Sequence, residues 1–169
     1  MTIVGTARLR LHPMTVADAA TMLAVLNDPD FITHVADRGI RTLAEAETYV
    51  AEGPAATWRA HGYGPFVVTD RADGTVLGTC GLHRRPFFDD ADLGYGFLPA
   101  ARGKGYAREA ARGVIGFARD AGLARLLATV SPANPASWML LEDLGFVHER
   151  DMTYPGTEKT VRVYGVALA

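Results

Sequence analysis

A short basic turn, Arg102-Gly103-Lys104-Gly105-Tyr106-Ala107, carries the clearest chemical signal in this chain. It follows a strand-like run over residues 91–98 and precedes a long helical pattern. Two glycines let the backbone approach a ligand closely, and successive amides can point into one concavity. The helix start adds unpaired N–H groups and the positive end of its dipole. The turn is suited to hold the pyrophosphate of a nucleotide-containing cofactor, although a plain strand-to-helix turn with solvated charges is an open alternative.

The spacing within this turn excludes two familiar phosphate loops. A Walker loop requires Ser or Thr after its Gly-Lys, whereas Lys104 is followed by Gly105. The dinucleotide fingerprint requires a third small residue at its sixth position, which is Arg108 when counted from Gly103. The pattern that remains is Arg-x-x-Gly-x-Ala.

Composition limits the other possibilities. The net charge is −2, which argues against a general binder of nucleic acid or of membrane surfaces, so any positive field must be local. Cys80 is the only cysteine, so an internal disulfide is impossible, and no histidine shows ligand spacing, so we expect no metal. No signal-like segment or bilayer-length apolar run is present, and we expect a cytoplasmic protein. The densest basic cluster lies in and after the turn: Arg102, Lys104, Arg108 and Arg112.

The elements around the turn form a strand–helix–strand unit. After the turn, small and apolar residues recur at helical spacing from Ala107 to Ala118, and Gly122 ends the helix. Residues 125–130 are an apolar run typical of a buried strand. The short connection predicts that this strand and the strand at about 91–98 are parallel. Asn134 and Pro135 then suit the start of another helix, which ends at Gly145.

The rest of the chain supplies further strands and helices. We expect strands at 7–11, 65–69, 75–82, 146–153 and 160–167, and helices at 16–26 and from Thr42 to about Glu52. Glu45 completes a possible capping box with Thr42. Segment 31–41 is a loop or a short helix, and the connection containing Trp58, His61 and Tyr63 stays unassigned. Together, these elements predict a single α/β domain over residues 1–169, with a mixed sheet and helices on both of its faces.

The ordered set of motifs resembles the GCN5-related N-acetyltransferases (GNAT), and in particular the branch that acetylates ribosomal-protein N-termini. The turn resembles the acetyl-CoA pyrophosphate loop of that family. The resemblance implies the GNAT fold, with a mostly antiparallel sheet of about six or seven strands and a splayed parallel pair in the centre. The other matching segments are Thr6–Leu11, Gly78–Leu82, Asp92-Leu93-Gly94-Tyr95, Asn134-Pro135-Ala136-Ser137 and Leu141–Phe146.

The resemblance also implies acetyl transfer from acetyl-CoA to an amine by direct attack in a ternary complex. The pantetheine arm would enter between the splayed strands and pair with exposed backbone, as an added strand does. A backbone N–H near residues 96–98 is the expected oxyanion donor. Gly94 and Gly96 suit a bulge there, with close backbone packing as the alternative. The expected cofactor-binding residues are Phe97, Leu98, Arg102, Gly103, Lys104, Gly105, Tyr106, Ala107, Arg108, Asn134 and Ser137.

The acid and the base are assigned through the same resemblance. Many relatives carry a tyrosine acid seven residues after the position of Asn134, but here that residue is Leu141. The resemblance points instead to Ser137 as the donor to the leaving thiolate, against the alternative of an ordinary first-turn serine. Asp92 lies where the branch often has a glutamate, so it is the expected base, directly or through water. A strand-end carboxylate in an ion pair is the alternative, and His83 and Asp90 are substitutes.

The acceptor is the least determined feature. An α-amine has a pKa of about 7.7–8.0 and a lysine side chain one of about 10.4, so a weak base position favours an α-amine or a similar small amine. The branch often has a bulky residue where this chain has Gly96, which either widens the acceptor site or leaves space for Trp58 or Phe87. We expect acetyl-CoA and an amine as partners, without nucleic acid or membrane, in a monomer or homodimer. The alternative function is a degenerate acyl-CoA-binding module.

Overall fold

The computed structural model describes residues 3–168 and contains one eight-stranded sheet in the order β1-β2-β3-β4-β5-β6-β8-β7. Every neighbouring pair is antiparallel except β5 and β6. The expected mixed, mostly antiparallel sheet is therefore confirmed, with more strands than the six or seven expected. The strands are β1 (Val4–Gly5), β2 (Leu9–Pro13), β3 (Pro65–Asp70), β4 (Val76–His83), β5 (Asp92–Phe97), β6 (Arg125–Val130), β7 (Val147–Thr153) and β8 (Thr160–Ala167).

Six α-helices accompany this sheet in the described residues. They are α1 (Ala19–Leu26), α2 (Pro29–His34), α3 (Leu43–Glu52), α4 (Pro54–His61), α5 (Tyr106–Asp120) and α6 (Pro135–Asp143). The capping box of α3 is confirmed: the Glu45 N–H donates to Thr42 Oγ1 at 3.2 Å, and the Thr42 N–H donates to Glu45 Oε2 at 3.0 Å. This reciprocal bonding satisfies two amides that a helix start otherwise leaves unpaired.

The undecided segment 31–41 contains the latter part of α2, and the unassigned connection contains α4. Asp28 caps α2 by accepting the Phe31 N–H at 3.3 Å, and Pro29 occupies the first helical position. Pro54 begins α4 in the same way, and Gly62 ends it in the left-handed conformation with φ of 71°. The Gly53-Pro54 pair therefore both ends α3 and starts α4.

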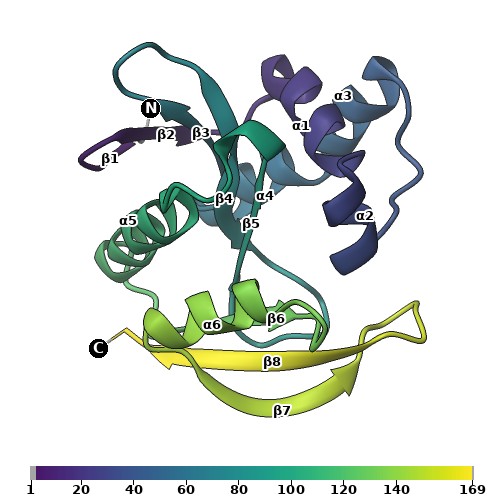
Figure 1. Ribbon diagram of the computed structural model, residues 1–169, viewed down its shortest axis with the longest axis vertical. Helices are drawn as coiled ribbons and strands as arrows, with labels where there is room; N and C mark the ends of the chain where they lie inside the picture. The colour runs from purple at the N-terminus through teal and green to yellow at the C-terminus, as the bar shows by residue number, and fades with distance from the viewer. Residues whose placement is uncertain (1–2, 169) are drawn as a thin grey trace.

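Helices cover both faces of the sheet, as expected (Figure 1). Alternate residues of β3 show the division, because Phe66 and Val68 belong to one apolar cluster and Val67 to another. The first cluster includes the buried face of α5 and Leu141 of α6. The second joins the sheet to α1 and α3.

The parallel strands β5 and β6 separate almost at once. Their pairing is limited to Asp92 opposite Leu127, supported by the Leu127 N–H donating to the Ala91 carbonyl at 2.9 Å. Figure 1 shows β5 leaving β6 and running up alongside β4. The splayed pair implied by the resemblance is therefore present, and it leaves backbone groups of β5 facing a gap.

Candidate active site

The basic turn presents a row of unpaired backbone amides. Gly103 and Gly105 adopt φ of 74° and 79°, a region that only glycine enters at little cost. The Arg102 N–H donates to the Pro99 carbonyl at 3.3 Å and the Glu109 N–H to the Gly105 carbonyl at 3.2 Å. Between them, the amides of residues 103–108 have no hydrogen-bond acceptor within residues 3–168. A helix start with consecutive unpaired N–H groups is suited to bind an anion.

The arginines of the turn are engaged by carboxylates. Arg102 forms ion pairs with Asp28 and with Asp30, the latter at 2.9 Å, so it ties the turn to the start of α2. Arg108 forms an ion pair with Asp143 at the end of α6. Much of their charge is therefore compensated, and both side chains brace the turn.

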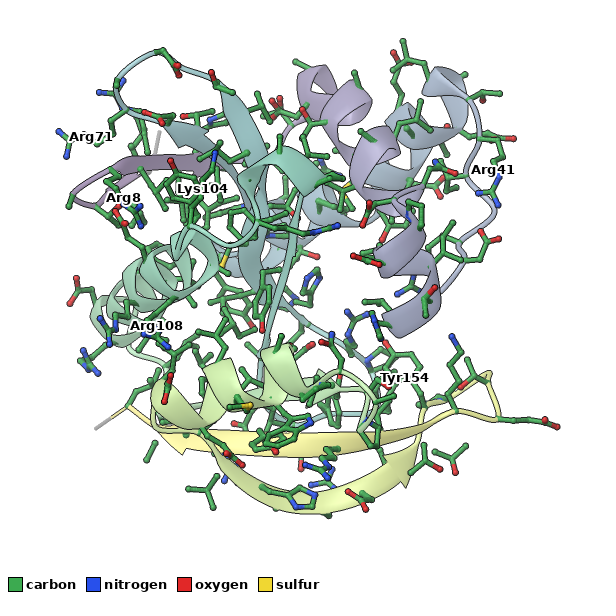
Figure 2. The ribbon with its side chains drawn as sticks, in the orientation of Figure 1. Arg8, Arg41, Arg71, Lys104, Arg108 and Tyr154 are labelled. Atoms are coloured by element: carbon green, nitrogen blue, oxygen red, sulfur yellow. The ribbon has the colours of Figure 1, made fainter. Side chains whose placement is uncertain are left out.

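Lys104 is the cation of the turn that keeps no carboxylate partner among the described residues. Its carbonyl accepts the Arg8 guanidinium at 2.9 Å, which brings Arg8 beside it (Figure 2). Arg8 in turn is held by Glu109, with Nε to Oε2 at 2.7 Å. The positive field of the turn thus comes from its amides, the helix start and the Lys104 ammonium.

A cavity of about 1040 Å³ extends from the gap between β5 and β6. Its wall includes four of the residues singled out in the sequence, Asp92, His83, Asn134 and Ser137. The wall also includes segments after α2, after β4 and between β7 and β8, together with residues of α1, α3 and α4. The fold therefore brings the expected acid and the expected base to one cavity.

Ser137 has a partner that the sequence did not indicate. The Tyr95 hydroxyl lies 2.6 Å from Ser137 Oγ, and both residues line the cavity. Burial raises the pKa of Tyr95 to about 12, although the hydrogen bond with Ser137 acts in the opposite direction. The phenol therefore stays protonated at neutral pH and can donate to Ser137, which leaves the serine proton available to another acceptor.

Asp92 is a buried carboxylate with one engaged oxygen. It is 2% exposed, its Oδ2 accepts Arg85 Nε at 3.2 Å, and its Oδ1 has no hydrogen-bond partner in the described structure. Burial raises the pKa of Asp92, while Arg85 opposes that rise. The carboxylate is thus a better proton acceptor than an exposed aspartate. The ion pair of the alternative interpretation is present. Asp92 also lies in the cavity wall, and its role as base stays a prediction.

His83 stands opposite Asp92 on the neighbouring strand. Burial, with added repulsion from the Arg85 and Arg38 guanidinium groups, lowers the pKa of His83 to about 3. The imidazole is neutral at physiological pH and is a weak base. Asp90 instead forms an ion pair with Arg125, Oδ2 to Nε at 3.3 Å. His83 lines the cavity beside Asp92, whereas Asp90 is not among the residues of the cavity wall.

Asn134 occupies the N-cap position of α6, but its side chain makes no capping hydrogen bond. The expected capping role of the amide is therefore not realised. The side chain lines the cavity, where its donor and acceptor are available to a ligand. Leu141, at the position of the missing tyrosine, is 2% exposed and part of the apolar core.

The strand register shows which backbone N–H near residues 96–98 is free to act as the oxyanion donor. The Leu98 N–H donates to the Leu77 carbonyl at 2.9 Å, so the amide of Leu98 is already occupied. In the antiparallel ladder with β4, Leu77–Leu98 is thus a hydrogen-bonded pair, and pairing alternates along the strand. The Phe97 amide accordingly points away from β4, toward the β6 side. The Phe97 amide therefore stays the predicted oxyanion donor, whereas the Leu98 amide is occupied by Leu77.

The glycines of β5 serve close packing, and the expected bulge is wrong. The pairing of β4 with β5 runs without a shift from Gly78–Phe97 to His83–Asp92. A Cβ on Gly94 would lie 3.0 Å from His83 Nε2, and one on Gly96 would lie 2.8 Å from Val25 Cγ1. The alternative reading of close packing is the correct one.

The space beside Gly96 is filled by side chains of α1 and α2. Val25 of α1 lies closest, and Phe31 of α2 lies 3.7 Å from the same point. Trp58 instead packs on Phe66, with ring centroids 4.9 Å apart. Neither aromatic residue proposed to fill this space does so, because α1 and α2 lie over β5.

Two features are absent from residues 3–168. No group of three or more His, Cys, Asp or Glu side chains is arranged to hold a metal ion. None of the helices there has both the length and the apolar character needed to span a bilayer.

Comparisons with known proteins agree with this arrangement. The model of the acetyltransferase (GNAT) domain matches residues 8–147. The uncharacterized protein YkkB of Bacillus subtilis (strain 168) is 28% identical over 168 residues, covering 94% of this chain and 92% of its own length.

Solved structures agree with the fold. A ribosomal-protein-S5-alanine acetyltransferase from Vibrio fischeri is 20% identical, with a TM-score of 0.79, and 99% of this chain and 97% of that one are covered. A spermidine N-acetyltransferase from Vibrio cholerae, in complex with CoA and spermine, is 18% identical, with a TM-score of 0.80 and coverage of 96% and 97%. The amide row at the turn, the splayed strands and the family match over most of the sequence lead to one conclusion: this chain belongs to the GNAT acetyltransferases.

Proposed function

We propose that this protein transfers an acetyl group from acetyl-CoA to a primary amine, either a protein N-terminal α-amine or a small amine of similar pKa. The observation that carries the proposal is the row of six unpaired amides at residues 103–108, in the turn that connects β5 to α5. The same strand β5 lines the cavity that opens where β5 and β6 part. The amides would hold the pyrophosphate, with Lys104 adding charge. The solved relative with CoA and spermine supports CoA as the cofactor of this fold.

The pantetheine arm would then lie in the gap and pair with outward-facing backbone of β5. This placement puts the thioester carbonyl near the Phe97 N–H, which would stabilise the oxyanion of the tetrahedral intermediate. The Asn134 amide would bind the arm from the other side of the cavity. No metal is needed in this scheme, because backbone amides supply the electrostatic stabilisation.

In the chemical step, the neutral amine nitrogen attacks the acetyl carbonyl carbon, forming the C–N bond. The C–S bond then breaks, and the sulfur leaves with its electron pair. The amine proton passes to Asp92, directly or through water, and the thiolate takes a proton from Ser137. Tyr95, whose hydroxyl is 2.6 Å from Ser137 Oγ, replaces that proton and recovers one from solvent. Asp92 releases the amine proton to solvent, so one proton leaves and one enters, and the enzyme returns to its starting state.

A thiol-release assay tests the proposal. Purified protein is mixed with acetyl-CoA and a panel of short peptides and small amines, and free CoA is followed with time. We expect release that depends on both substrates, together with acetylated amine detected by mass spectrometry. Binding of acetyl-CoA without turnover on any amine would refute the transfer and would favour the degenerate acyl-CoA-binding module.

A further inference from the structure

One part of the cavity wall is strongly cationic. Three segments form it: residues 35–38 after α2, residues 84–85 after β4, and the turn between β7 and β8. Tyr154 marks this region in Figure 2, between α2 and the β7–β8 hairpin. The cationic side chains of these segments are Arg38, Arg84, Arg85 and Lys159.

The carboxylates in the same wall do not balance these charges. Asp92 is paired with Arg85 at 3.2 Å, and Asp37 is paired with Arg41 at 2.7 Å. Glu52 is the other carboxylate lining the cavity within the described residues. In the same wall, three cations have no carboxylate partner among the described residues: Arg38, Arg84 and Lys159. One free carboxylate of the described wall therefore faces three free cations.

The segments that bear these cations are brought together over the cavity. Lys159 Nζ donates to the Val35 carbonyl at 3.5 Å, which links the β7–β8 turn to the loop after α2. Arg84 Nη1 donates to the Phe88 carbonyl at 2.6 Å, a neutral partner that leaves its charge uncompensated. The positive charge of this region also affects His83. Burial lowers the pKa of His83, and repulsion from the Arg85 and Arg38 guanidinium groups lowers it further. A further cation placed here would meet the same repulsion.

This distribution separates two classes of amine. A polyamine carries additional ammonium groups, which would lie against Arg38 and Lys159 with few carboxylates to receive them. An amine that also carries a carboxylate would instead find donors for it, and charge-assisted hydrogen bonds of this kind are among the stronger polar contacts. The amine itself would still find the buried Asp92 in the same cavity.

We propose that the acceptor is a small primary amine that bears a carboxylate, and that Arg38 and Lys159 bind this carboxylate while the amine reaches Asp92. The inference rests on the proposed acetyl transfer and names the substrate class of that site. It predicts that a polyamine, the ligand of one solved relative, is a poor acceptor for this chain.

The test compares two probes that differ in one charge. The dipeptide amides Ser-Glu-NH2 and Ser-Gln-NH2 share the same α-amine and nearly the same shape. Calorimetry measures their binding to the CoA-loaded protein, with spermidine as a third ligand, and the thiol-release assay measures their acetylation. We expect the glutamate probe to bind about tenfold tighter than the glutamine probe. Spermidine should bind more weakly than either.

Variants then assign the preference to the named residues. Lys159→Gln and Arg38→Gln should each reduce the affinity for the glutamate probe by several-fold and leave the glutamine probe nearly unchanged. Arg10→Gln, an exposed arginine of β2 outside the cavity wall, controls for the loss of one positive charge.

Each outcome decides the inference. A charge-dependent preference that shrinks in both cavity variants and not in the control supports it. Equal or undetectable binding of the two probes, tighter binding of spermidine, or a preference that the variants leave intact would overturn it. If the preference holds but no probe is acetylated, the acceptor class stands as a binding property, and the proposed acetyl transfer fails.

Discussion

His83 makes a quantitative prediction about stability in acid. The native fold lowers its pKa to about 3 from an ordinary value of 6.5, because burial and two neighbouring guanidinium groups disfavour the imidazolium. Below pH 6.5 the unfolded chain takes up a proton that the folded chain refuses until about pH 3. Stability from this group is therefore complete above pH 6.5 and is lost progressively as the pH falls toward 3.

The size of the effect follows from the same shift. Each pH unit inside this window costs about 1.4 kcal/mol, so lowering the pH from about 7 to about 5 should cost up to about 2 kcal/mol of unfolding free energy. That figure is an upper value, since His83 is only partly removed from solvent and water screens part of the repulsion.

Urea denaturation at fixed pH values between 5 and 7 measures this contribution. We expect His83→Gln to flatten the pH dependence relative to the parent protein, since glutamine carries no titrating group. His61→Gln controls for removing an exposed imidazole at the end of α4. Parallel curves for the parent and His83→Gln would refute the reasoning, because the two proteins would then take up the same number of protons on unfolding.

Two further predictions concern the cavity. Ser137→Ala should lower kcat about 10- to 100-fold with little change in CoA affinity, and Tyr95→Phe should act similarly. The double variant should lose little more than either single one, because the two hydroxyls form one hydrogen-bonded unit; fully multiplicative losses would contradict the relay. The Cys80 thiol should not react with Ellman's reagent in the native protein, because its side chain is buried and burial raises the pKa of that thiol. Rapid labelling that precedes unfolding would contradict the burial.

Local signals in the sequence predicted much of this fold. The glycine-rich turn, the small-residue face of α5 and the capping box of α3 are set by residues within a few positions of one another. The strand–helix–strand unit followed from its short connection, and the parallel pairing of β5 with β6 is confirmed. The segment of α4 stayed unassigned, because a glycine–proline pair such as Gly53-Pro54 can end one helix as well as start the next.

The site was less predictable, since its decisive contacts join distant residues. Tyr95 and Ser137 are 42 positions apart and meet only because α6 packs over the parted strands. Arg102 pairs with Asp28, so a side chain assigned to phosphate binding is largely occupied. The filling of the space at Gly96 by Val25 depends on where α1 lies, which no local pattern shows. Arg38 and Lys159 meet by the same kind of long-range placement.

Calorimetric titration with CoA of the parent protein and of Gly105→Val tests the central claim most directly, that the amides of residues 103–108 hold the cofactor pyrophosphate. Valine at this φ of 79° distorts the turn and sets a branched side chain beside the amides. Gly74→Val is the matched control, because Gly74 has a φ of 76° in the β3–β4 turn and a Cβ there meets nothing within 4 Å. The account predicts that Gly105→Val weakens CoA binding at least about tenfold, while Gly74→Val binds like the parent. Unchanged CoA affinity in folded Gly105→Val would contradict it.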